Sequence, residues 1–305
     1  MPGENLGGII GTPVTPFTAD AELDTALLER LVEFHVVHGS DALALPMHVG
    51  ESLDLSMEER KTLCEVAVKT VGGRVPVLAH VSLPGTAQVV ELARHAESAG
   101  ADGIVVVTPY HWRPGPDALF AHFSAVASAV GIDVLLYNFP ARLGVAVTPE
   151  LVRRLVERHP NVTGIKDATY DMQSFTEMAR HVAEIAPGFR LYTGVEYPLP
   201  GMVLGGHGCF SPSLQIAPGL VRALYEACRS GDWAAALPLQ RKTSTLWQLL
   251  NDGSPATSLK VALELMGRPV GEVRLPLAPL DEPRRAALRA GLEDLGVLSG
   301  EPLGW

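Results

Sequence analysis

The sequence contains little that would attach it to a membrane or build a disulfide framework. Only three of its 305 residues are cysteines, too widely spaced for a disulfide framework or a zinc cluster. No run approaches the ~20 apolar residues that a membrane helix needs. The opening MPGENLGGII lacks the basic region and apolar stretch of a secretory signal. These absences predict a cytoplasmic protein without a membrane partner.

Positive charge is also scarce. Lys and Arg total 24 against 34 Asp and Glu, and the formal net charge is -10. Because binding to a phosphate backbone depends on clustered cations, we expect no nucleic-acid partner. Hydrophobic residues make up 47% of the chain and charged residues 19%, which is typical of a globular enzyme with a sizeable core.

A recurring pair of elements organises most of the chain. Eight β-rich runs recur at intervals of very roughly 30 residues, and a helical pattern follows each. Most runs are continuously apolar, as parallel strands are when both faces are covered. The runs are GGIIGTPVTPF, DALALPM, VPVLAHV, GIVVVTPY, DVLLYNFP, VTGIKDA, FRLYTGV and GCFSPSL. No glycine-rich nucleotide loop follows the first run, so the pattern favours a (β/α)8 TIM barrel over an open doubly wound α/β sheet.

Helical patterns replace the strand signal from about Ala217 onward. We therefore predict two parts, a barrel catalytic domain over residues 1–216 and a C-terminal helical extension over residues 217–305. Helix starts are marked by Asp24 as an N-cap and by Ser56 with Glu59 as a capping box.

Titratable residues gather where the predicted strands end, which is where a barrel of this kind carries its reactive groups. These positions are Thr15, His48, His80, Tyr110, His111, Tyr137, Lys166, Gly194 and Ser211. Lys166 alone among the lysines ends an apolar run, whereas the others fall in segments typical of solvated helices: Lys61, Lys69, Lys242 and Lys260.

Burial disfavours the charged form of a lysine, so Lys166 would have a lowered pKa and some neutral, nucleophilic amine. The alternative is a lysine that reaches the rim or pairs with Asp167. Tyr137 alone would be a core ring with a satisfied hydroxyl. Beside an imine-forming lysine, its phenol can shuttle the proton that imine formation requires.

The chain resembles the dihydrodipicolinate synthase/N-acetylneuraminate lyase superfamily of Schiff-base class I aldolases over nearly its full length. The matching stretches are VTPF, GES, AGADGIVVVTPY, YNFPARLG, NVTGIKDAT, TGVEY and GGHGCFS. The resemblance implies that Lys166 forms an imine with pyruvate or a related 2-oxo acid and that Tyr137 shuttles protons. It also implies a homotetramer built of tight dimers, with no metal and no cofactor beyond the covalent imine.

The resemblance further assigns the 2-oxo acid carboxylate to the loop before Gly50 and Glu51, through backbone amides that we place at His48 and Val49. Arg142, in the stretch YNFPAR, is expected from the resemblance to contact a carboxylate of the substrate, which suggests an acidic acceptor or a 2-oxo acid with a second polar arm; the alternative is a surface arginine that bridges to a neighbouring loop. His80, with Arg142, is expected to shape the distal pocket. Two residues in matching stretches, Gly194 and Phe210, complete the predicted substrate-binding set.

Three histidines mark departures from the family pattern. Lysine-biosynthetic members carry Gly-Thr-Thr-Gly-Glu in the second loop, where this chain has Met47, His48 and Val49 and lacks both hydroxyls. His111 replaces the tyrosine that reaches into a neighbouring subunit's site, and His80 occupies space normally left for substrate. We expect one or two of these histidines to act as proton relay or hydrogen-bond donors, because histidine has a pKa near neutrality. A zinc site at His48, His80 and His111 is a disfavoured alternative, since it would make Lys166 redundant.

The sequence thus predicts a carbon-carbon lyase that cleaves or forms an aldol between a 2-oxo acid and an aldehyde. The missing hydroxyls favour this over one alternative in the same class, a 4-hydroxy-tetrahydrodipicolinate synthase-type condensation. The dehydration of a 2-oxo-3-deoxy sugar acid is a further alternative in that class. An alternative of a different class is a catalytically silent 2-oxo-acid binding protein that keeps Lys166 and has lost the relay.

Overall fold

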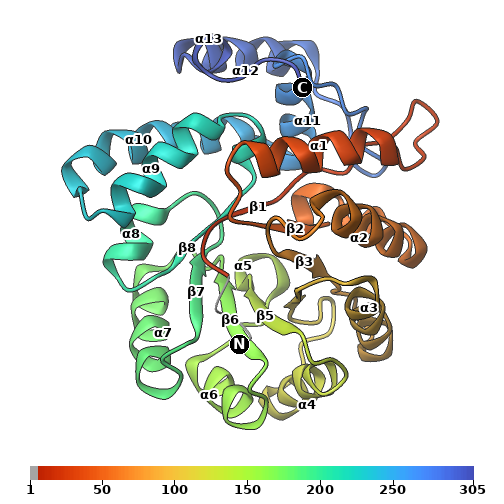
Figure 1. The fold of residues 1–305 in the computed structure, drawn as a ribbon, viewed down its shortest axis with the longest axis vertical. Coiled ribbons are helices and arrows are strands. Elements are labelled where there is room, and N and C mark those ends of the chain that lie inside the picture. The colour runs from red at the N-terminus through yellow and green to blue at the C-terminus, as the bar shows by residue number, and fades with distance from the viewer. Residues whose placement is uncertain (1–5) are drawn as a thin grey trace.

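Eight parallel strands form a closed barrel in the computed structural model, which describes residues 6–305. Each strand pairs with the next, and the last pairs with the first. Figure 1 shows the strands inside a ring of helices, so the predicted TIM barrel is confirmed. The strands are β1 Gly8–Gly11, β2 Ala42–Leu45, β3 Val77–His80, β4 Gly103–Val107, β5 Asp133–Asn138, β6 Val162–Asp167, β7 Arg190–Thr193 and β8 Gly208–Ser211.

Two helices of the barrel begin at the caps that the sequence predicts. Asp24 accepts a hydrogen bond from the Leu27 N–H, and Ser56 with Glu59 forms a complete capping box. The elements between strands are α1 Thr25–Val37, η1 His48–Gly50, η2 Ser52–Asp54, α2 Met57–Val71, α3 Thr86–Ala99, α4 Pro116–Ala127, α5 Pro140–Leu143, α6 Pro149–Arg158, α7 Met172–Ile185 and α8 Pro198–Val203.

A helical layer follows β8 and lies along one side of the barrel (Figure 1). Its first helix, α9, contacts both α8 and β1, and also contacts α10. It therefore covers the barrel and at the same time begins the extension. The division of the chain after residue 216 stays a prediction. The elements are η3 Ser213–Gln215, α9 Pro218–Arg229, α10 Trp233–Leu250, α11 Pro255–Leu265, α12 Glu282–Asp294 and α13 Val297–Gly300. Within residues 6–305, none of the helices has the length and apolar character needed to cross a bilayer.

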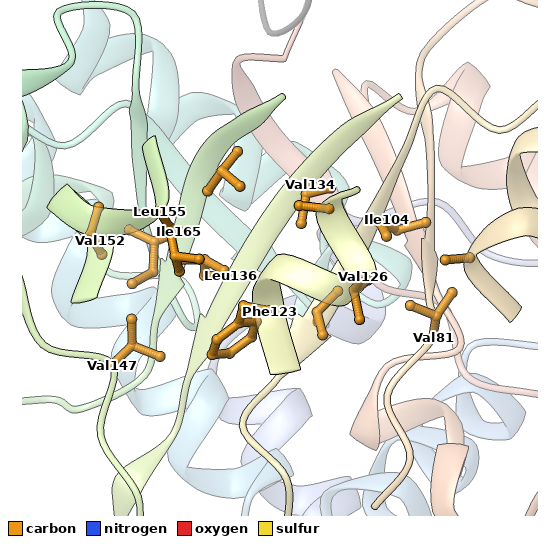
Figure 2. Packing of buried hydrophobic residues seen from close by; sticks show 14 of the residues in the cluster. Val81, Ile104, Phe123, Val126, Val134, Leu136, Val147, Val152, Leu155 and Ile165 are labelled. Carbon is orange, nitrogen blue, oxygen red and sulfur yellow. The ribbon is translucent and has the colours of Figure 1, made fainter. Parts of the chain in front are cut away.

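Side chains alternate between the barrel interior and the layer between strands and helices. In β5, Leu135 and Tyr137 belong to the interior cluster, whereas Val134 and Leu136 belong to the outer one. Figure 2 shows this outer layer, with Leu136 and Ile165 of the strands close to Phe123 of α4. Because the strand period is two residues, Lys166 faces the side opposite to Ile165, which is the interior.

We expect Phe123→Ala to lower the free energy of unfolding by about 3–5 kcal/mol, because the ring is fully buried and its loss leaves a cavity. Leu237→Ala on α10 is the matched control, since Leu237 is 44% exposed. Chemical denaturation of both variants measures the difference. Equal losses of stability would contradict the packing described.

Candidate active site

Lys166 and Tyr137 lie side by side at the C-terminal ends of β6 and β5, where their Cα atoms are register partners. The Lys166 Nζ lies 3.9 Å from the centroid of the Tyr137 ring and 5.1 Å from that of Phe210. Lys166 is only 6% exposed. Among the described residues, its Nζ has no hydrogen bond or ion pair, and Asp167 instead accepts hydrogen bonds from Thr169 and Asn138. The alternative pairing of Lys166 with Asp167 is therefore wrong.

Burial sets the protonation of this pair. Desolvation lowers the pKa of Lys166 from 10.5 to about 7, and the negative charge of Glu196 opposes the shift. A large fraction of Lys166 is consequently neutral amine at pH 7. Burial raises the pKa of Tyr137, with the nearby Tyr170 as a smaller cause, so its phenol stays protonated and can donate a hydrogen bond. An amine nucleophile and a proton donor thus stand together.

His48 and His80 form an edge-to-face pair beside Tyr137, with ring centroids 5.4 Å apart. The His80 Nδ1 lies 2.9 Å from the Pro46 carbonyl oxygen. Because a carbonyl oxygen only accepts, Nδ1 carries the hydrogen and Nε2 holds a lone pair. The Nε2 atoms of both histidines are buried without a hydrogen-bond partner in the described part of the chain.

Both imidazoles are neutral at pH 7. Burial, with the charges of Lys166, Arg60 and Arg142, lowers the pKa of His48 to about 3. Burial also places the pKa of His80 well below 6.5. The expectation of a relay that titrates near neutrality is therefore wrong for these two residues. The neutral His80 is suited instead to accepting a hydrogen bond from a bound hydroxyl at Nε2, and the neutral His48 ring can donate or accept one.

Two charged groups that the sequence did not single out as functional are buried near this centre. Arg60 of α2 donates from Nη1 to the Ser82 carbonyl oxygen at 2.9 Å and from Nη2 to the Ser52 carbonyl oxygen. Glu196 accepts hydrogen bonds from the Ser211 hydroxyl at 2.7 Å and the Ser213 N–H at 2.6 Å. Arg60 lies within a helix, so its sequence context gives no signal; Glu196 stands in the family-matching stretch TGVEY, which could have indicated it.

Gly194 and Phe210 shape the surroundings of the lysine. A Cβ on Gly194 would lie 2.5 Å from the Ala168 Cβ, so only glycine allows the end of β7 to approach β6 here. The Phe210 ring is fully buried and packs edge-on against Tyr192. Phe210 lies next to the lysine, and Gly194 lies against Ala168 and Asp167, which follow the lysine in the chain. The predicted contact of both residues with substrate stays a prediction.

The other predicted residues lie farther out. His111 is exposed, with φ 73, and its ring contacts Trp112 at 4.9 Å. Arg142 is exposed on α5, and its charge acts on His48 and Tyr170. Residues 6–305 contain no group of three side chains placed to ligate a metal, so the structure does not assemble the three-histidine zinc site.

A row of aromatic rings leads from Tyr137 to the surface. Phe139 stacks on Tyr137 at 5.8 Å, Tyr170 meets Phe139 at 6.5 Å, and Tyr197 meets Tyr170 at 6.3 Å. Tyr170 has φ 56 and is 54% exposed. Left-handed backbone at a non-glycine residue costs about 1–3 kcal/mol and is enriched at functional sites.

A model of the dihydrodipicolinate synthetase family matches residues 5–295. The chain belongs to this family. It is 37% identical over 287 residues to a 4-hydroxy-tetrahydrodipicolinate synthase of Acidiphilium cryptum. The aligned region covers 94% of this chain and 97% of that protein.

Solved structures in the dihydrodipicolinate synthetase family share the fold closely. YagE of E. coli K12, solved in complex with pyruvate, has a TM-score of 0.92 and 36% identity, covering 96% of this chain and 99% of that one. A monomeric dihydrodipicolinate synthase variant has a TM-score of 0.92 and 30% identity, covering 97% and 99%. The family resemblance inferred from the motifs is confirmed, and with it the assignment to the lyases.

The lowered pKa of Lys166 predicts how imine formation depends on pH. With its pKa at about 7, the neutral amine falls about tenfold per pH unit below that value and levels off above it. The rate of adduct formation with pyruvate, trapped by cyanoborohydride, should follow this curve. A rate that continues to rise up to pH 10 would contradict the burial argument.

Glu196→Gln should move this midpoint to lower pH, because the carboxylate charge raises the pKa of Lys166. Glu177→Gln, at an exposed position on α7, is the matched control and should leave the midpoint unchanged. The same trapping assay measures both variants. A midpoint that stays in place or moves up in Glu196→Gln would show that the carboxylate does not act on Lys166.

Proposed function

We propose that the protein is a lyase that joins the Lys166 Nζ to the ketone carbon of pyruvate or a related 2-oxo acid as a Schiff base. The observation that carries the proposal is a buried amine with a pKa near 7, next to a protonated phenol with no hydrogen-bond partner among the described residues. Membership of the family and the pyruvate complex of YagE support the same substrate class.

The chemistry follows from these two groups. The neutral Nζ attacks the ketone carbon, and Tyr137 supplies the proton with which the carbinolamine hydroxyl leaves as water. The Tyr137 phenolate left by that step takes the C3 proton, and the iminium accepts the electron pair of the C3–H bond, which gives a neutral enamine. The enamine carbon then attacks an aldehyde carbon, and the new alkoxide takes up the proton from the Tyr137 phenol. Hydrolysis of the imine releases the product, and the reverse sequence cleaves an aldol.

The surrounding residues suit substrate binding. We assign the backbone amides of His48 and Val49 to the 2-oxo acid carboxylate, following the family's use of this loop. His80 and Arg142 would face the aldehyde portion, with the His80 Nε2 as acceptor for a substrate hydroxyl. His111 lies on an exposed loop, from which it could serve a neighbouring subunit. These roles are proposals for testing.

Condensation is the better supported direction. Relatives that match nearly the whole chain, such as that of Acidiphilium cryptum, are named 4-hydroxy-tetrahydrodipicolinate synthase. The sequence alone favoured cleavage because both loop hydroxyls are missing. A product assay decides: pyruvate with an amino aldehyde that carries a carboxylate tests condensation, and a panel of 4-hydroxy-2-oxo acids tests cleavage. Turnover of neither, and no dehydration of a 2-oxo-3-deoxy sugar acid, with an adduct still formed, would favour the silent binding protein.

The homotetramer is part of the proposal. The fold alone does not require it, because a monomeric synthase variant has the same fold. Sedimentation of the purified protein tests it, and a monomer would exclude a role for His111 in a neighbour's site.

We expect Tyr137→Phe to slow adduct formation with pyruvate by about 10²–10⁴-fold, the usual contribution of a positioned proton donor. Lys166→Met should abolish the adduct. Tyr225→Phe on α9 is the matched control and should leave the rate unchanged. Borohydride trapping with peptide mass mapping measures all three. An adduct on another lysine in the wild-type protein would overturn the assignment.

A further inference from the structure

An ion pair that is almost completely buried links the C-terminal extension to the loop after β2. Lys260 of α11, which the sequence placed on a solvated helix, is buried, so that prediction was wrong. Its Nζ lies 2.7 Å from the Glu51 Oε1, and the two side chains are 3% and 0% exposed. The ammonium also lies 4.1 Å from the centroid of the Phe17 ring. Little water reaches this pair, so each charge depends on the other.

Glu51 follows the short helix η1 as its C-cap, and the first two residues of this helix are His48 and Val49. It has φ 56, in the left-handed region, and its N–H donates to the His48 carbonyl oxygen at 3.1 Å. On the other side, the Thr15 hydroxyl donates to the Gly50 carbonyl oxygen at 2.6 Å. The loop is therefore held from the barrel by Thr15 and from the extension by Lys260.

The segment between α11 and α12 strengthens this attachment. The Arg274 N–H donates to the Glu51 Oε2 at 2.8 Å, and Lys260 donates to the Glu272 carbonyl oxygen at 2.8 Å. Arg274 also forms an ion pair with Glu59 at 2.5 Å. The Glu51 carboxylate thus pairs with the Lys260 ammonium through Oε1 and accepts the Arg274 N–H through Oε2. Neither contact touches the Lys166 centre directly.

We propose that Lys260 is a positioning residue: acting through Glu51, it fixes the loop whose His48 and Val49 amides receive the substrate carboxylate. The proposal rests on the proposed function. Breaking a buried ion pair leaves an uncompensated charge, which the loop can relieve only by moving. A displacement of about 1 Å at a positioning element can lower a rate about a hundredfold. Breaking the ion pair should therefore weaken the binding of the substrate carboxylate and leave the reaction of the Lys166 amine with a ketone unchanged.

The test compares two ketones that differ in the carboxylate. Lys260→Met keeps the length of the side chain and removes its charge. Trapping with borohydride over a range of concentrations should show that half-maximal modification of Lys166 by pyruvate needs at least about tenfold more ligand. Trapping with acetone, which has no carboxylate, should change by less than about twofold. Lys242→Met, at an exposed lysine of α10, is the matched control and should behave as wild type with both ketones.

Further variants separate positioning from general stability. Lys260→Arg keeps the charge and should need less pyruvate for half-maximal modification of Lys166 than Lys260→Met does. If Lys260→Met does not fold, Glu51→Gln is the second variant: it breaks the same ion pair from the other side, leaves the Lys260 charge uncompensated and should show the same selective loss. Equal effects on pyruvate and acetone, or none on either, would overturn the proposal. A wild-type protein that forms no pyruvate adduct would instead refute the proposed function on which it rests.

Discussion

The exclusion of water from the end of β6 is the constraint on which the proposed chemistry depends. Lys166 faces the barrel interior, where Tyr137 and Phe210 cover its ammonium group and no carboxylate pairs with it in the described residues. Desolvation therefore works against the charged form and brings its pKa to about 7. In open solvent the same side chain would be almost fully protonated and unreactive at neutral pH.

The barrel produces this situation through strand register. Parallel pairing sets Tyr137 opposite Lys166, and the two-residue period turns both side chains inward at the same end of the barrel. Gly194 lets the neighbouring strand close against this point. Glu196 limits the pKa shift, because its charge favours the ammonium. The reactive amine is thus a consequence of packing, and the strands supply it before any substrate arrives.

The sequence predicted the features that depend on local pattern. Eight apolar runs with capped helices between them are sufficient to indicate the barrel, and strand ends indicate Lys166 and Tyr137. Features that depend on long-range contacts were missed. Lys260 looks like any helical lysine until α11 packs on the loop carrying Glu51. The low pKa of His48 follows from the burial and charges around it, which no local pattern shows.

The most direct test is the titration of Lys166 itself. With lysine labelled at Cε with ¹³C, the resonances of the five lysines can be followed against pH by NMR, and Lys166→Met assigns the one that matters. The account predicts that the Lys166 signal titrates at about pH 7. A Lys166 signal that titrates near 10.5 would show that the barrel does not desolvate the amine, and the proposed mechanism would lose its basis.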